Sequence, residues 1–270
     1  MTTPIVIYHG PSMIDGSPIV CLASVGSSNV KTGSMVQTWI MRADMHPSEA
    51  SATKADESVC GLCPRRHALG GDCYVQIVHA PRSVWLAWER SGFPGSNWAD
   101  PTQILRMTQD ARDHGLRLGS YGDPMAVPFE VWQDLISALM PRSVVGYTHQ
   151  WRSIPCGPIT DLVDGMSARH MESAFWFRDN IMASCDSTRD VATADMLGWR
   201  KFLAVPEGTE IPAGMVQCPA TREQNPLTCD RCGICNGVQG KSSRASVYLV
   251  EHGMRSQSKA KRVAALAVIP

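Results

Sequence analysis

Cysteine is the residue type in this chain whose spacing most clearly points to chemistry. Thiolates bind metals and carry out redox reactions, and here most of them are clustered rather than scattered. Disulfide scaffolds are usually small secreted domains, whereas this chain has 270 residues. We therefore expect metal or redox chemistry. The ten cysteines are Cys21, Cys60, Cys63, Cys73, Cys156, Cys185, Cys218, Cys229, Cys232 and Cys235.

The first cysteine group is Cys60-Gly-Leu-Cys63, with Cys73 after a gap of nine residues. Two thiolates separated by two residues can hold one metal centre from a tight turn. A structural zinc ion normally has four protein ligands, whereas a four-iron cluster held by three cysteines leaves one iron open. The group therefore predicts a [4Fe–4S] cluster. If His67 is a fourth ligand, the group is a zinc knuckle instead.

The second cysteine group is Cys229-Asp-Arg-Cys232-Gly-Ile-Cys235, preceded by Cys218. A cysteine at every third position resembles the loops that hold ferredoxin-type clusters. With Cys218 the group offers four ligands, which also suits a closed zinc site. A second [4Fe–4S] cluster and a zinc ion both remain open here. Cys21, Cys156 and Cys185 stand alone and are expected to be small buried side chains.

Charge and hydropathy limit the classes of protein. Lys and Arg number 25, as do Asp and Glu, which argues against a general nucleic-acid coating protein. Residues 236–270 nevertheless carry six basic residues against Glu251, so this end is either a solvated tail or a phosphate-contacting segment. No apolar run approaches the roughly 18 residues that span a bilayer, and the start does not resemble a secretory signal. We expect a cytoplasmic protein with no membrane partner.

The elements that must position these cysteines alternate between strands and helices. This alternation predicts an α/β fold with mainly parallel strands, arranged as a partial (β/α) barrel followed by a cysteine-rich metal loop. The predicted strands are 4–8, 18–24, 34–41 (or a short helix), 116–121, 144–148, 181–185, 200–205, 215–217 and 247–250. The predicted helices are 81–91, 100–112, 128–139, 159–178 and 190–197.

Three segments follow from this pattern. Residues 1–58 are N-terminal strands and a leader to the first cysteine group, and 59–212 form the partial barrel with that group. Residues 213–270 hold the second group, the last strand and the basic tail.

Polar residues follow the predicted strands at the end where a parallel sheet places its site. The carboxyl ends of parallel strands open on one side of the sheet. We therefore expect one site facing the first cysteine group, in which Asp123, His149 and Asp186 act as catalytic residues. The expected cofactor-binding residues are Ser120, Asp123 and Gln150. Asp123 also precedes Pro124, so it is alternatively a turn cap.

The order of motifs over roughly residues 29–252 resembles the radical-SAM-like proteins carried by phages and plasmids, which are distantly similar to spore photoproduct lyase. The motifs are Cys73-Tyr-Val, Gly119-Ser-Tyr-Gly-Asp-Pro, Tyr147-Thr-His-Gln-Trp and Met182-Ala-Ser-Cys-Asp. Radical SAM enzymes usually space their cysteines by three and then two residues, whereas the gaps here are two and nine.

This resemblance implies a [4Fe–4S] cluster on Cys60, Cys63 and Cys73, with S-adenosylmethionine bound at the open iron. Reductive cleavage of that cofactor by an external electron donor then yields a radical that takes hydrogen from a substrate. Together with the basic tail, the resemblance suggests a nucleotide, nucleic acid or related metabolite as substrate. Cys218, Cys229, Cys232 and Cys235 would hold an auxiliary cluster or zinc.

Two other functions fit the same residues. The first is a zinc-stabilised nucleic-acid-binding protein without catalysis. The second is a zinc-containing barrel similar to transglycosylases, with Asp123 or Asp186 as nucleophile or base.

Overall fold

The computed structural model describes residues 4–25, 29–93, 101–153, 168–222, 224, 226–239 and 245–251. Cys156 lies outside the described residues. The first part of the predicted helix 159–178 also lies outside them, as does most of the basic tail.

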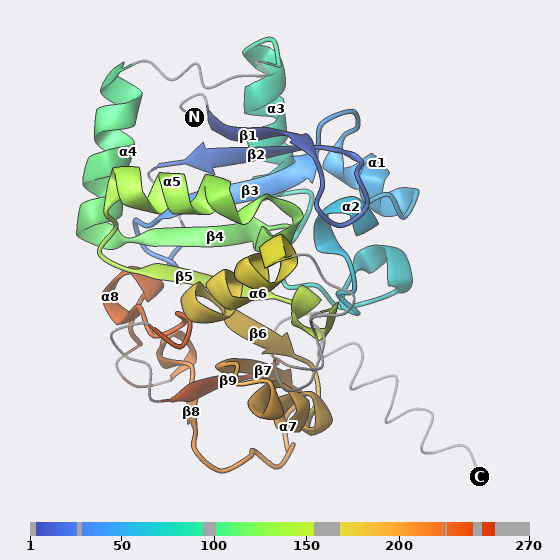
Figure 1. The fold of residues 1–270 in the computed structure, drawn as a ribbon, viewed down its shortest axis with the longest axis vertical. Coiled ribbons are helices and arrows are strands. Elements are labelled where there is room, and N and C mark those ends of the chain that lie inside the picture. The colour runs from blue at the N-terminus through green and yellow to red at the C-terminus, as the bar shows by residue number, and fades with distance from the viewer. Residues whose placement is uncertain are drawn as a thin grey trace.

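One nine-stranded sheet runs through the molecule (Figure 1). Its strand order is β1-β2-β3-β4-β5-β6-β7-β9-β8, and it does not close on itself. β2 is antiparallel to β1 and β3, and every pairing from β3 to β8 is parallel. The strands are β1 (Ile5–Pro11), β2 (Pro18–Ser24), β3 (Val36–Arg42), β4 (Leu116–Tyr121), β5 (Val144–Thr148), β6 (Met182–Cys185), β7 (Lys201–Val205), β8 (Met215–Gln217) and β9 (Ser246–Val250).

The helices connect the parallel strands. They are α1 (Pro47–Ala52), α2 (Glu57–Cys60), α3 (Ala80–Arg90), α4 (Pro101–His114), α5 (Phe129–Leu139), α6 (Ala168–Asn180), α7 (Thr188–Met196) and α8 (Cys229–Cys232). Short 3-10 turns are η1 (His67–Leu69), η2 (Pro124–Ala126), η3 (Gln150–Ser153) and η4 (Pro219–Thr221).

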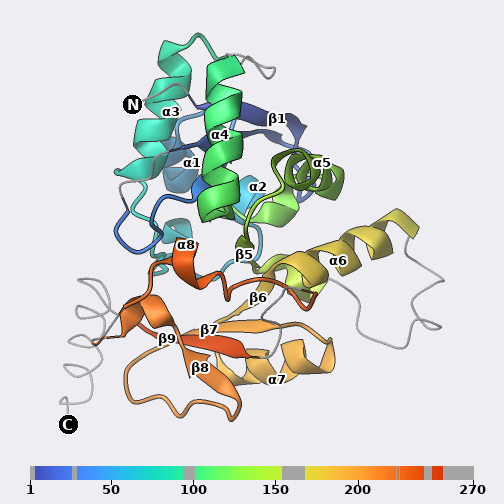
Figure 2. The ribbon, with the colours of Figure 1, turned by 90° about the vertical axis from the view of Figure 1, so that its left-hand side faces the viewer.

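Strands β3 to β7 lie next to one another in chain order, so each crossover returns to the neighbouring position. Right-handed crossovers then place their helices on the same face of the sheet. α5, α6 and α7 lie together on the near face in Figure 1, and the quarter turn of Figure 2 shows them on one side of the strands. α8 and α2 lie at opposite ends of the strands (Figure 1).

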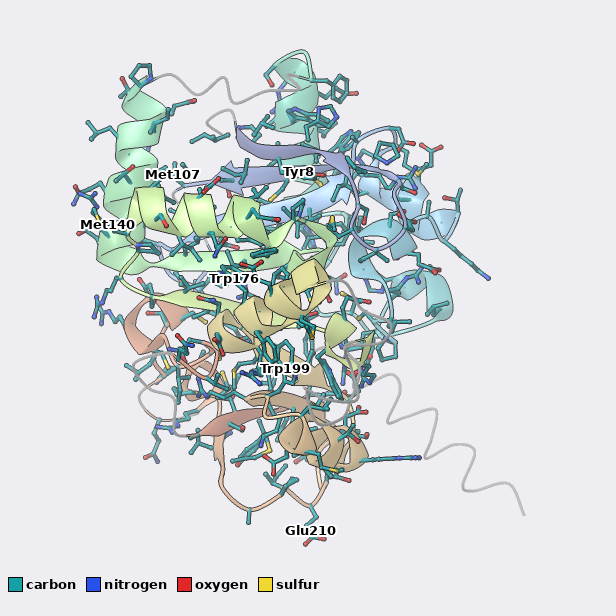
Figure 3. The ribbon with its side chains drawn as sticks, viewed as in Figure 1. Tyr8, Met107, Met140, Trp176, Trp199 and Glu210 are labelled. Carbon is teal, nitrogen blue, oxygen red and sulfur yellow. The ribbon has the colours of Figure 1, made fainter. Side chains whose placement is uncertain are left out.

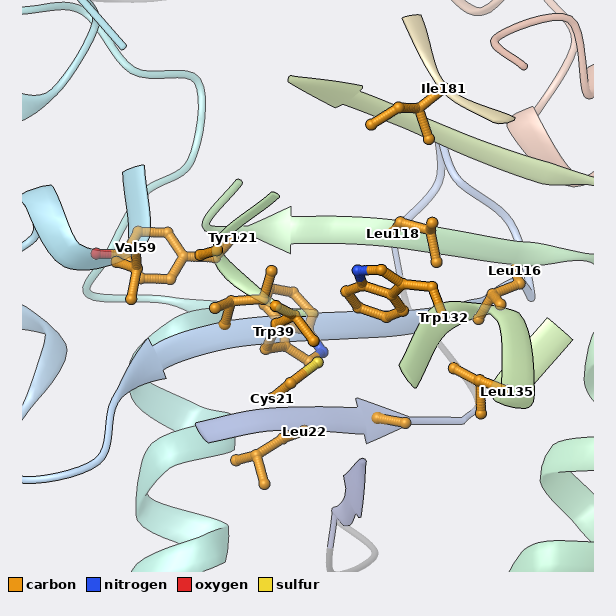
Figure 4. Packing of buried hydrophobic residues seen from close by; sticks show 14 of the residues in the cluster. Cys21, Leu22, Trp39, Val59, Leu116, Leu118, Tyr121, Trp132, Leu135 and Ile181 are labelled. Carbon is orange, nitrogen blue, oxygen red and sulfur yellow. The ribbon is translucent and has the colours of Figure 1, made fainter. Parts of the chain in front are cut away.

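The main core packs apolar side chains of the sheet against helices that include α3, α4 and α5. Leu116 and Leu118 of β4 pack with Trp132 and Leu135 of α5 (Figure 4). The Trp132 indole is fully buried, and its N–H donates to the Pro124 carbonyl oxygen at 2.9 Å. Outside the core, Met140 and Glu210 project from the periphery (Figure 3).

Strand β4 is irregular just before it reaches the site. Its pairing with β3 shifts between Gln37 and Trp39. At this point the Thr38 hydroxyl connects β3 to β4. It accepts a hydrogen bond from the Gly119 N–H at 2.9 Å and donates one to the Arg117 carbonyl oxygen at 3.2 Å. Such irregularities re-aim the side chains that follow, which here are Ser120 and Tyr121.

The α/β class and the mainly parallel sheet are confirmed. The 34–41 segment is a strand, and the predicted strands 116–121 and 144–148 match β4 and β5. Helices α1, α2 and α8 were missed. In the described part of the chain, no helix is both long and apolar enough to cross a membrane.

Candidate metal centre

The first cysteine group occupies the end of α2 and the loop that follows it. The Cys60 N–H donates to Asp56 within the α2 turn, and the Cys63 N–H donates to the Cys60 carbonyl at 3.2 Å. The Cys73 N–H donates to the Arg65 carbonyl at 2.9 Å. This bond folds the loop back on itself, so the third cysteine returns to the first two.

The three thiols share one environment. Cys60 and Cys73 each interact electrostatically with Cys63, and Cys60 also interacts with Cys73. Burial raises the pKa of Cys73 to about 11, and burial also raises the pKa of Cys60, so both are protonated at neutral pH. The Val75 N–H already donates to the Cys73 sulfur at 3.4 Å.

Gln150 fastens the Cys60–Cys63 turn to the carboxyl end of β5. Its side-chain amide donates to the Cys60 carbonyl at 3.2 Å and accepts from the Leu62 N–H at 3.4 Å. A β-carbon at Gly61 would lie 2.3 Å from the Gln150 amide nitrogen, and φ at Gly61 is 52°, so another residue would displace the Gln150 side chain and strain the turn. The turn is thereby held against β5.

Arg65 fastens the same loop to β6, β7 and β9. Its guanidinium donates to Asp186 at 2.5 Å, pairs with Glu251 at 2.8 Å, and donates to the Ala204 carbonyl at 2.8 Å. A fourth contact reaches Asp72 within the loop at 3.2 Å. Asp186 and Glu251 follow the ends of β6 and β9, and Ala204 belongs to β7, so Arg65 joins the loop to three strands.

Arg66 points the other way, into the helical leader. Its side chain is 4% exposed and pairs with Asp56 at 2.7 Å and with Glu57 at 3.2 Å. It also donates to the carbonyls of Gly61 and Lys54. The two adjacent arginines therefore hold the loop from both sides.

His149 connects a thiol to a carboxylate. A ring nitrogen lies 3.1 Å from Asp186, and the ring also hydrogen-bonds to Cys63. Although burial opposes the charged form, these two partners raise the pKa of His149 to about 9. Burial likewise opposes ionisation of Asp186, but His149 and Arg65 hold its pKa below the ordinary value. The pair is an imidazolium beside a carboxylate.

The Asp123 carboxylate is occupied by main-chain donors. One oxygen accepts from the Met125 N–H at 3.0 Å, which caps η2, and the other accepts from the His149 N–H at 2.8 Å. Its own N–H donates to the Val59 carbonyl at 2.6 Å. Burial raises the pKa of Asp123 in spite of these bonds. Asp123 thus joins the ends of β4 and β5 to α2.

Two buried hydroxyls at the end of β4 have no hydrogen-bond partner among the described residues. They belong to Ser120, 7% exposed, and Tyr121, 4% exposed. Tyr121 interacts electrostatically with Cys60 and Cys73, and burial raises its pKa well above the usual value. Its hydroxyl therefore stays protonated and can donate a hydrogen bond.

The structure brings Asp123, His149, Gln150 and Asp186 together around the first cysteine group, each through the contacts described above. Neither carboxylate is free as a nucleophile, because N–H donors occupy both. Sequence reasoning missed Arg65 and Tyr121. The sequence signal that could have indicated a role for Arg65 is the pair of consecutive arginines between Cys63 and Cys73.

His67 contacts the loop backbone. Its ring nitrogens lie 3.3 Å from the Gly71 carbonyl oxygen and 3.2 Å from the Val75 carbonyl oxygen. Cys21 and Cys185 are fully buried. Among the described residues, no group of three or more Cys, His, Asp or Glu side chains is already arranged to hold a metal ion.

The second cysteine group lies at the other end of the sheet. The N–H groups of Cys229 and Asp230 donate to Lys31 and Thr32, which precede β3. The two groups are therefore separate sites.

No family model, curated protein or solved structure matches this chain.

Proposed function

We propose that Cys60, Cys63 and Cys73 hold a [4Fe–4S] cluster and that the protein is a radical-SAM-like enzyme. The observation that carries the proposal is the position of the loop. The loop that carries three half-buried thiols is bonded, through Gln150 and Arg65, to the carboxyl ends of parallel strands, where such sheets place their sites. The chain order of β3 to β7 also suits a partial barrel.

The residues around the thiols fit an anionic sulfur-rich centre. A buried hydroxyl without a partner is costly, and the Tyr121 hydroxyl interacts electrostatically with Cys60 and Cys73. Metal-bound thiolates would give the Tyr121 hydroxyl an acceptor. Holding a cluster also requires the three thiol side chains to turn toward one point, which the glycine-containing loop permits.

This centre, when bound, would pass one electron from an external donor to S-adenosylmethionine at its open iron. The chain's own residues position the reactants. In this proposal the Ser120 hydroxyl, which has no partner among the described residues, contacts the cofactor, and the Gln150 amide holds the cysteine turn beside it. Asp123 fixes the ends of β4 and β5, and the His149–Asp186 pair presents a proton donor beside Cys63 to the substrate. The substrate class we propose is a nucleotide or nucleic acid.

A second candidate rests on the contact between His149 and Cys63. If His149 lost its proton, it could join the three thiols as a fourth zinc ligand. Asp186 would then orient the imidazole, as carboxylates commonly do for zinc-bound histidines. Four protein ligands would close the site, so this protein would bind nucleic acid without catalysis.

Anaerobic incubation with dithionite and S-adenosylmethionine distinguishes the radical-SAM enzyme from the zinc-containing nucleic-acid-binding protein. The radical-SAM proposal expects release of methionine by the wild-type chain and none by Cys63→Ala. Cys185→Ala is the matched control, because it removes a buried thiol outside the group, and it should retain the reaction. A wild-type chain that carries one zinc ion at this group and releases no methionine supports the second candidate instead.

A further inference from the structure

The four thiols of the second cysteine group also share one environment. Cys235 interacts electrostatically with Cys218, Cys229 and Cys232, and Cys235 hydrogen-bonds to the Tyr147 hydroxyl. Cys218, Cys229 and Cys235 pack in a small apolar cluster with Met35, Val145, Met182 and Val247. This cluster is separate from the main core.

Main-chain hydrogen bonds connect this group to three distant parts of the sheet. The Cys218 N–H donates to Tyr248 of β9 at 2.8 Å, and the Cys229 N–H donates to Lys31 before β3 at 2.9 Å. The Cys235 carbonyl accepts from Gly146 of β5 at 3.2 Å. A metal ion that fixed these cysteines would therefore fix three strands relative to one another.

Two arginines beside these thiols, buried Arg200 and half-buried Arg117, have no acidic partner in the described part of the chain. Arg200 is 5% exposed, and its partners are carbonyl oxygens, including those of Ile234 and Asn236, together with the Asn236 side-chain oxygen. Arg117 lies over the Tyr147 ring at 5.9 Å and interacts with Cys229. Within the described ranges, neither guanidinium pairs with a carboxylate, and the Nε of each has no partner. Buried cations require a nearby negative charge.

We propose that Cys218, Cys229, Cys232 and Cys235 hold one zinc ion as a tetrathiolate. Four thiols lose their protons to solvent on binding, so the zinc and its ligands carry a net charge of −2. The guanidinium groups of Arg117 and Arg200 offset that charge. Four protein ligands leave no open position, so the zinc is structural and holds the end of the chain to β3, β5 and β9. This inference is independent of the function proposed for the first cysteine group.

The test measures zinc and iron per chain in Cys229→Ser/Cys232→Ser, with Cys63→Ala as the control. The double variant should lose one zinc ion, keep its iron and melt at a lower temperature. Cys63→Ala should keep the zinc. The proposal is overturned if the double variant retains its zinc. It is also overturned if the wild type contains no zinc and the double variant loses iron and sulfide. Loss of iron in Cys63→Ala concerns only the first group.

Cobalt gives a readout that does not need the double variant to fold. In a chain with Cys60, Cys63 and Cys73 replaced by Ala, one cobalt ion should show thiolate charge-transfer bands and tetrahedral d–d bands. Arg117→Gln in that background should weaken zinc binding by roughly tenfold or more, as loss of a partner around a metal site does. Arg112→Gln should not, because the Arg112 guanidinium donates to the Leu139 carbonyl and interacts with none of the four thiols among the interactions described. Octahedral cobalt bands, or equal zinc affinity in the two arginine variants, would contradict the proposal.

Discussion

The Tyr121 hydroxyl is buried beside Cys60 and Cys73 without a hydrogen-bond partner among the described residues. Tyr121→Phe removes it with little change of shape. Because an unsatisfied buried group is costly, the metal-free variant should be as stable as the wild type or more so. In the cluster-containing protein, Tyr121→Phe removes a hydrogen bond to a cysteine sulfur. The reduction potential of the cluster should therefore fall by on the order of tens of millivolts.

Redox titration of the loaded protein measures this potential, and thermal unfolding measures the metal-free stability. Tyr8→Phe is the control, because the Tyr8 hydroxyl donates to the Pro11 carbonyl at 2.8 Å. An unchanged potential in Tyr121→Phe would show that its hydroxyl does not reach the centre.

Asp123→Asn tests whether this carboxylate is structural. Since its oxygens accept from the N–H groups of Met125 and His149, an amide would place a donor against a donor. We expect a loss of roughly 1–3 kcal/mol in the free energy of unfolding, measured in denaturant. Normal stability combined with weak binding of S-adenosylmethionine would show instead that Asp123 contacts the cofactor.

Individual residues were predictable where their type dictates chemistry. The spacing of Cys60 and Cys63 indicated a turn that can present two thiolates, and the residues after β4, β5 and β6 were expected at one edge. The partners of Arg65 were not predictable. Asp186 and Glu251 are distant in sequence, and no periodic pattern connects them to the loop.

At the scale of elements, Gly61 sets how closely the cysteine turn approaches β5. Gly61→Ala adds a collision with Gln150 to the backbone strain of a positive φ angle of 52°. Gly70→Ala is the matched control in the same loop, because its φ is 75° but nothing lies within 4 Å of the added carbon. The control should cost about 1–2 kcal/mol, and Gly61→Ala should cost more and lose metal.

Thermal unfolding and iron content of the two variants check this expectation. Equal effects in Gly61→Ala and Gly70→Ala would mean that the contact between Gln150 and the turn is unimportant.

Strands were the elements that the sequence predicted best. β4 and β5 are short apolar runs that end before glycine, proline or polar residues, so their limits were clear. α1 was missed because only Pro47 and Ala50 of its six residues are buried, which leaves no apolar stripe to recognise. The contact between α2 and η2, where the Asp123 N–H donates to the Val59 carbonyl, is a tertiary contact without a local signal.

At the scale of the whole molecule, the two cysteine groups lie at opposite ends of one sheet, and the basic tail follows β9. Replacing Arg255, Lys259, Lys261 and Arg262 with Gln tests whether that tail contacts phosphate while leaving Glu251 with Arg65. If the tail contacts phosphate, the variant should bind duplex DNA more weakly. The slope of log affinity against log salt concentration should also become shallower by up to about 3.6.

Fluorescence anisotropy at several salt concentrations measures this slope. Replacing Glu207 and Glu210 with Gln is the control for a general change of charge, because both lie in the loop after β7. An identical slope for wild-type and tail variants would place the tail outside any nucleic-acid contact.

The central claim is that the first cysteine group holds an iron–sulfur cluster. Iron and acid-labile sulfide per chain, after anaerobic purification, test it most directly in the wild type and in the Cys60→Ala/Cys63→Ala/Cys73→Ala variant. The account predicts about four of each in the wild type and none in the triple variant, with zinc retained in both. Full iron in the triple variant, or zinc in place of iron at this group in the wild type, would contradict it.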